Sequence, residues 1–153
     1  SLYRRALNII GRTDLINDRK ALYIKTLSIL KIIEEINPLT GIVSEGRGHL
    51  LVENSDIRVD GWEKQAINEF KNALKLNPTL FRARLALARL LVQQGDLNEA
   101  VVLMNIGVSY QYRNFLNGID QFYKYAIDLN LMNGDTVKER EIQLDKGLLP
   151  VNQ

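Results

Sequence analysis

Hydrophobic residues recur every three or four positions along most of the chain, which is the period of one face of an α-helix. The clearest pattern covers 62–74, where the intervening positions are polar or charged. Comparable patterns follow at 85–92, 97–108 and 119–127, and a weaker one covers 136–147. No segment alternates apolar and polar residues between turn signals, which is the pattern of a half-buried strand. The chain is therefore predicted to be all-α.

The helix boundaries are marked by prolines and glycines. A long apolar run predicts one helix over 15–37, and Pro38 and Pro78 each follow an asparagine at the end of such a run. The residue before a proline is pushed out of the helical region, so both positions are predicted helix ends. Gly-Asp pairs at 95–96 and 134–135 predict a helix end followed by the N-cap of the next helix. Short turns of this kind join helices into antiparallel hairpins.

The first of these turns also carries a capping signal. Asp96 is followed three residues later by Glu99, an acidic variant of the capping box. We therefore expect the Asp96 side chain to accept a hydrogen bond from the first turn of the next helix.

The chain contains an internal period of 34 residues. Residue pairs at this spacing are Gly61 and Gly95, Ala66 and Ala100, Phe70 and Met104, and Ala73 and Gly107. Small residues around a large apolar residue, with Pro78 at the end, resemble the second helix of the tetratricopeptide repeat family, whose unit is a 34-residue helical hairpin. The resemblance implies stacked hairpins forming an α-solenoid, because a single hairpin cannot bury its apolar face.

The resemblance is uneven along the chain. The unit at 81–114 fits nearly throughout, although Tyr112 stands where proline is usual, while the preceding unit needs an insertion near 57–61. We predict one helical-repeat domain of five to seven helices, covering 1–153 and cut from a longer protein. Its predicted parts are N-terminal helices at 1–38, a first hairpin at 39–80, the best unit at 81–114 and a degenerate hairpin at 115–148.

Composition and charge limit the chemistry. The chain has no cysteine and a single histidine, His49, so disulfides and thiol catalysis are excluded and a metal site is disfavoured. The net charge of +2 is too small to indicate nucleic-acid binding. The most apolar segment, 21–36, is too short and too charged to cross a bilayer. We expect no catalytic residues, no metal and no cofactor, and hence a binding module rather than an enzyme.

The resemblance also implies a binding surface, because the first helices of such hairpins line a concave groove that holds peptides. In this register the predicted groove residues are Arg82, Leu85, Arg89, Gln93, His49, Asn117 and Lys124. Members of the family that bind a peptide carboxylate commonly have asparagine and lysine where this chain has Arg89 and Leu85, so that specificity is not expected. A mildly basic groove favours an acidic peptide, although the arginines are equally compatible with a role in solubility alone.

Two functions follow as hypotheses. The first is an interaction or scaffold module that binds a peptide or partner protein in the groove. The second comes from the tyrosine-rich penultimate hairpin and the charged final helix, which resemble the C-terminal tail of bacterial O-antigen polymerases and ligases. That resemblance implies a periplasmic location and a role in assembly or substrate recruitment; otherwise a cytoplasmic location is expected. The pattern leaves the oligomeric state open.

Overall fold

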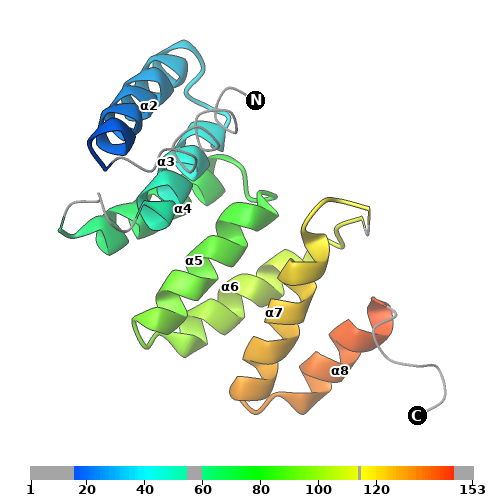
Figure 1. The fold of residues 1–153 in the computed structure, drawn as a ribbon. Helices are drawn as coiled ribbons and strands as arrows, with labels where there is room; N and C mark the ends of the chain where they lie inside the picture. Colours follow the sequence, from blue (N-terminus) through cyan, green and yellow to red (C-terminus); the bar gives the residue numbers. More distant parts are fainter. Residues whose placement is uncertain (1–15, 55–59, 114, 147–153) are drawn as a thin grey trace. The chain divides into compact units, whose positions relative to one another are not determined.

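The computed structural model describes residues 16–54, 60–113 and 115–146, and they form helices joined by turns (Figure 1). The helices are α2 (Ile16–Ile36), α3 (Ile42–Glu53), α4 (Trp62–Leu76), α5 (Phe81–Gln93), α6 (Leu97–Ser109), α7 (Ile119–Met132) and α8 (Thr136–Asp145). No strand occurs among these residues. The prediction of an all-α protein built from helical hairpins is confirmed, and most helices begin and end within a few residues of the predicted positions.

The chain divides into two compact units, Ser1–Pro78 and Thr79–Gln153. The boundary lies close to the predicted junction of the first hairpin and the best repeat unit. Most of the predicted insertion near 57–61 lies outside the described residues, as does the helical pattern expected at the very start of the chain. The prediction of a single domain over 1–153 stays a prediction.

In the first unit, α3 packs extensively against α4 and less extensively against α2. Phe70 of α4 is fully buried and lies directly over Gly48 of α3. A Cβ atom at Gly48 would lie 2.7 Å from the Phe70 ring, closer than side chains tolerate. Glycine disfavours the helix by about 1 kcal/mol relative to alanine, but the crossing has no room for a side chain at this position.

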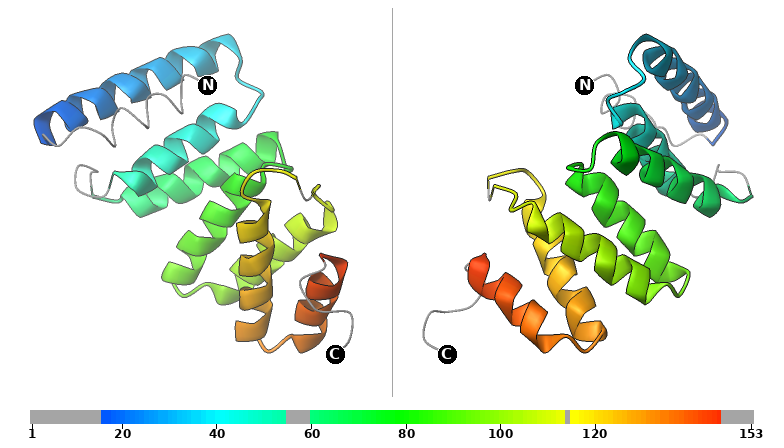
Figure 2. Two further views of the ribbon diagram at one scale, coloured as in Figure 1. Left: turned by 45° about the vertical axis from the view of Figure 1, so that its right-hand side comes forward. Right: turned by 180° about the vertical axis from the view of Figure 1, so that it is seen from behind.

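In the second unit, the α5–α6 and α7–α8 hairpins can be followed from two sides in Figure 2. Ala88, Ala100, Met104 and Ala126 are completely buried. A Cβ atom at Gly107 would lie 2.5 Å from both Phe122 Cζ and Arg84 Cδ. Small residues therefore lie at close helix crossings in both units, and large apolar side chains fill the remaining space.

The two Gly-Asp turns have the same hydrogen-bond pattern. Gly95 and Gly134 have φ angles of +90° and +78°, which glycine adopts without strain. The amide of Asp96 donates to Leu91 O, and the amide of Asp135 donates to Asn130 O. These bonds close each helix in a Schellman motif before the next helix begins.

The capping prediction was wrong for the first of these turns. Asp96 is the N-cap residue of α6, but its side chain accepts no hydrogen bond from the helix. The side chain of Asp135 does cap α8, accepting from the Lys138 amide at 2.9 Å. Sequence spacing places the residue at the cap, whereas side-chain rotation decides whether the bond forms.

Aromatic rings fill the centre of the second unit. Tyr112 contacts Phe81 and Phe122 with ring centroids 5.5 Å apart in both cases. Tyr123 packs edge-on against Phe122 at 5.3 Å and is almost fully buried. Tyr112 and Tyr123 are therefore packing residues of the second unit.

One pair of amides joins α6 to α7. Asn130 is completely buried, and it exchanges two hydrogen bonds with Asn105 at 2.8 and 3.0 Å. A third bond runs from the Asn130 amide to Ala126 O at 2.7 Å. This pairing satisfies a polar group that would otherwise destabilise the interior.

Candidate functional site

The surface formed by α5 and α7 in the second unit combines basic and aromatic side chains. Helix α5 contains three arginines and no acidic residue, but Arg84 is buried and donates to Leu103 O, which leaves Arg82 and Arg89 to face outward. We call the surface made by Arg82, Arg89, Gln93, Lys124, Tyr125 and Asp128 the α5/α7 face.

The guanidinium of Arg89 lies 5.4 Å from the centroid of the Tyr125 ring. Burial raises the pKa of the Tyr125 hydroxyl, the positive charge of Arg89 lowers it, and the carboxylate of Asp128 raises it. These three side chains therefore lie close enough to interact. The cation–π contact restricts the orientation of the Arg89 side chain, which remains exposed to solvent.

Arg82 lies at the other end of α5. Its Nη2 donates to Asn117 O at 2.8 Å, and its guanidinium lies 5.7 Å from the Phe81 ring centroid. Asn117 itself precedes α7 and belongs to the turn that enters this helix. Part of the hydrogen-bonding capacity of Arg82 thus holds this turn in place.

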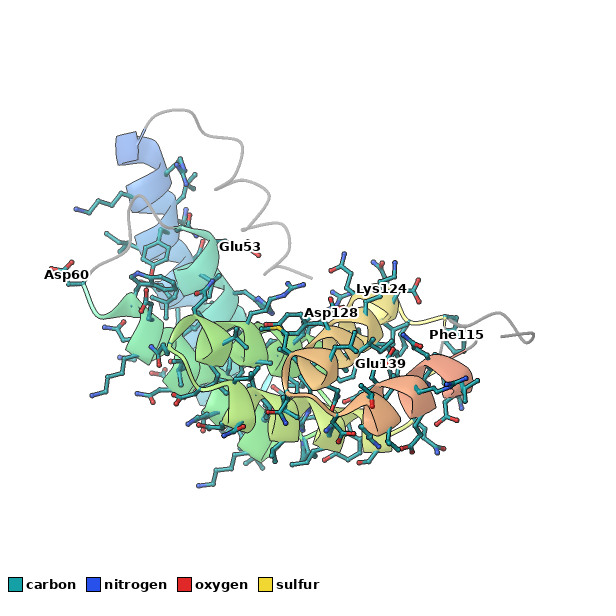
Figure 3. The ribbon with its side chains drawn as sticks, turned by 90° about the horizontal axis from the view of Figure 1, so that it is seen from below. Glu53, Asp60, Phe115, Lys124, Asp128 and Glu139 are labelled. Carbon is teal, nitrogen blue, oxygen red and sulfur yellow. The ribbon has the colours of Figure 1, made fainter. Side chains whose placement is uncertain are left out.

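Lys124 and Asp128 are four residues apart on α7, and Figure 3 shows both side chains. Both are exposed, and the spacing places them on the same side of the helix. The α5/α7 face therefore carries three basic side chains and one acidic side chain, which gives it a positive charge, although the second unit as a whole has eight basic and eight acidic residues.

The remaining predicted groove residues differ in their surroundings. Leu85 is only 6% exposed, so it supports the face from below and offers a partner little surface. Gln93 is exposed at the end of α5. His49 lies in the first unit, where its ring packs edge-on against Phe70 and its Nε2 is 3.6 Å from Glu45 Oε1. These contacts make His49 a packing residue of the α3–α4 hairpin.

Comparison with known protein families identifies one part of the chain. Residues 63–111 match the tetratricopeptide repeat family. The matched segment runs from the first turn of α4 through α5 and α6. Tetratricopeptide repeats generally mediate protein–protein interaction or scaffolding. No curated protein matches the chain.

The tetratricopeptide match and the helical hairpins together establish an all-α helical-repeat fold. Within the described residues, no group of three or more histidine, cysteine, aspartate or glutamate side chains could hold a metal ion. Among the same residues, no helix is both long and apolar enough to cross a membrane.

Two members of the α5/α7 face, Tyr125 and Asp128, were not among the predicted groove residues. Tyr125 is the ring that supports Arg89. Asp128 lies on the same side of α7 as Lys124. The available signal was its position four residues after Lys124, which places the two on one side of a helix.

Proposed function

We propose that the second unit is a protein-interaction module whose α5/α7 face binds an acidic segment of a partner protein. The observation that supports this proposal most directly is the excess of basic side chains on one exposed face. Arg82, Arg89 and Lys124 contribute positive charge, and Asp128 is the one acidic side chain among the residues of this face. The free energy that an acidic segment gains from charge-assisted hydrogen bonds at such a surface would exceed the free energy of hydration that it loses.

Arg89 is the residue best prepared for this role. Its stacking on Tyr125 reduces the conformational entropy that a free arginine would lose on binding. A guanidinium held by its face presents its N–H groups along the edge, which is the geometry of a bidentate bond to a carboxylate. Arg82 lies about two turns from Arg89 on α5 and Lys124 is adjacent to Tyr125 on α7, so both add positive charge to the same face.

Asp128 tunes the specificity of the face. Its carboxylate repels an acidic ligand and favours a segment that has a neutral or basic residue opposite it. Neutralising this residue should therefore strengthen the binding of a uniformly acidic peptide, a result that a nonspecific role in solubility does not predict.

The proposal can be tested with a fluorescein-labelled peptide of ten alternating glutamate and leucine residues, measured by fluorescence anisotropy. Arg89→Gln is expected to weaken binding about 10- to 100-fold, because one charge-assisted hydrogen-bonding group contributes about 1.5–3 kcal/mol. Asp128→Asn is expected to strengthen binding. Lys64→Gln changes the net charge by the same amount at an exposed position of α4 and serves as the control.

Equal affinities for the Arg89→Gln and Lys64→Gln proteins would show that only overall charge matters and would overturn the proposal. The same result would favour the simpler hypothesis that the arginines keep the surface soluble.

The periplasmic tail of a glycan polymerase or ligase stays a prediction from sequence resemblance. The full-length sequence is the test of that hypothesis: several membrane-spanning segments before Ser1 would support it, and a flank without them would contradict it.

A further inference from the structure

The first unit contains a cleft of about 780 Å³ between α2, α3 and α4. Helices α2 and α4 both pack against α3 but contact each other little. One part of the cleft is lined by apolar side chains from two helices, Tyr23, Ile24 and Leu27 of α2 and Leu51 of α3. Tyr23 and Leu51 are buried, whereas Ile24 is 54% exposed. The cleft therefore offers an apolar surface that no described residue covers completely.

An ion-pair cluster lies beyond this apolar part. Arg47 of α3 donates from Nη1 and Nη2 to the two carboxylate oxygens of Glu34, at 2.7 Å in both cases. Its Nε donates to Glu69 Oε1 of α4 at 3.0 Å. Arg47 thus joins all three helices around the cleft. This cluster has a structural role, because its bonds are made within the unit.

Lys31 is the one charged group of the cleft lining that this cluster does not include. It lies on α2, one turn from Leu27 and three residues from Glu34, and it is exposed. No ion pair joins it to any described residue. The lining as a whole has two basic and two acidic side chains, so binding there would depend on apolar contact, with Lys31 supplying the local charge preference.

We propose that this cleft is a second docking site, which receives an amphipathic α-helix of a partner protein. The partner helix places aliphatic side chains against Ile24, Leu27 and Leu51, and a carboxylate beside Lys31. Leu27 and Lys31 are four residues apart, about 6 Å along the helix axis. A partner helix running alongside α2 therefore carries its acidic residue about one turn from its apolar anchors.

The shape and chemistry of the cleft favour this occupant. Its walls are themselves helices, and a helix laid between two others buries apolar residues at i, i+3, i+4 and i+7. The polar side of such a helix would face Gln65 and Asn68 of α4, which also line the cleft and are exposed. The site lies in the first unit and is independent of the function proposed for the α5/α7 face.

The test uses the full chain and a labelled 14-residue peptide with leucines at i, i+3, i+4 and i+7 and glutamate on the flanks. A second peptide replaces the glutamates with lysine. Two pairs of variants on α2 are compared by fluorescence anisotropy. Ile24→Asp and Lys31→Glu change the cleft, whereas Ile32→Asp and Lys25→Glu change exposed positions of the same helix outside the lining. Ile32 is a close match for Ile24, because it is 56% exposed.

The glutamate peptide is expected to bind the unaltered chain and to lose at least 10-fold in affinity with Ile24→Asp and with Lys31→Glu, while both control variants retain it. Lys31→Glu should in turn improve binding of the lysine peptide. Circular dichroism confirms that all four variants fold. Failure of the glutamate peptide to bind, or equal losses from cleft and control variants, would overturn the proposal. Binding of the apolar dye 1,8-ANS in the cleft without any binding of the peptide would also overturn it.

Discussion

Replacing Gly107 with alanine tests a tight helix crossing in the second unit. Gly107 lies on α6, where an added Cβ would be 2.5 Å from Phe122 Cζ and 2.5 Å from Arg84 Cδ. Neither neighbour can move away easily. Phe122 is completely buried, and Arg84 is 4% exposed and donates to Leu103 O at 3.0 Å.

Two effects of opposite sign determine the magnitude. Alanine is a better helix former than glycine by about 1 kcal/mol, which on its own would stabilise α6. Overpacking a close-packed interior costs about 1–3 kcal/mol. Because the added atom meets two constrained side chains at once, we expect the overpacking to win. Gly107→Ala should therefore lower the free energy of unfolding by about 1–2 kcal/mol, or the melting temperature by a few degrees.

Urea unfolding followed by circular dichroism at 222 nm measures this change. Asn98→Ala is a matched control on the same helix, because it raises helix propensity at an exposed position. The control should leave the free energy of unfolding unchanged or raise it by a few tenths of a kcal/mol. The two variants are thus expected to change stability in opposite directions.

A stabilised Gly107→Ala protein would refute the reasoning, since helix propensity alone predicts that result. A double-mutant cycle identifies the cause. Phe122→Leu removes the ring atom that meets the new Cβ, so Gly107→Ala should cost less in that background. An unchanged cost would show that the Phe122 ring is not the obstacle.

Further predictions concern three other contacts. Arg47→Met should lower the free energy of unfolding by about 1–3 kcal/mol in thermal melts, because it leaves the partly buried carboxylates of Glu34 and Glu69 unpaired. Equal melting temperatures for the variant and the unaltered protein would contradict this prediction. Hydrogen bonding to Arg47 lowers the pKa of Glu34 in the folded protein. The ion pair therefore contributes its full stabilisation at pH values above the pKa of glutamate in the unfolded chain. This stabilisation is lost as the pH falls through the lower pKa of Glu34 in the folded protein. The same variant should therefore weaken the acid dependence of stability, and an unaltered dependence would argue against the pair. Asn130→Leu should cost about 1–3 kcal/mol in urea unfolding, since it leaves the facing amide of α6 without its partner, and a neutral effect would contradict this. Arg89→Gln should raise the pKa of Tyr125 further, because the arginine opposes the effect of burial, and a fall in an NMR titration of the tyrosine ring would contradict the stacked geometry.

The predicted groove shows where residue spacing ceases to be informative. Arg89 and Leu85, which lie four residues apart on one helix, were assigned to the same surface by the register of the tetratricopeptide resemblance. In the structure Arg89 is exposed, whereas Leu85 is 6% exposed. The width of the buried stripe on α5 depends on how closely the neighbouring helix approaches, and that distance has no signature in the sequence of α5 itself.

The turns and the helices were predictable because their causes are local. A 3.6-residue period, a proline after asparagine and a glycine with positive φ each act within a few residues of chain. The 34-residue period added the pairing of helices into hairpins, since it repeats the small residues at which helix backbones meet.

The binding surfaces depended on the tertiary structure. The stacking of Arg89 on Tyr125 joins residues 36 positions apart, and the cleft is lined by residues of α2 and α4 that are at least 31 positions apart. Contacts of this kind follow from the angle and distance at which helices cross, and many side chains contribute to both. The sequence by itself determined which segments are helical and how they pair, whereas the packing of those helices decided which side chains remain free to bind a partner.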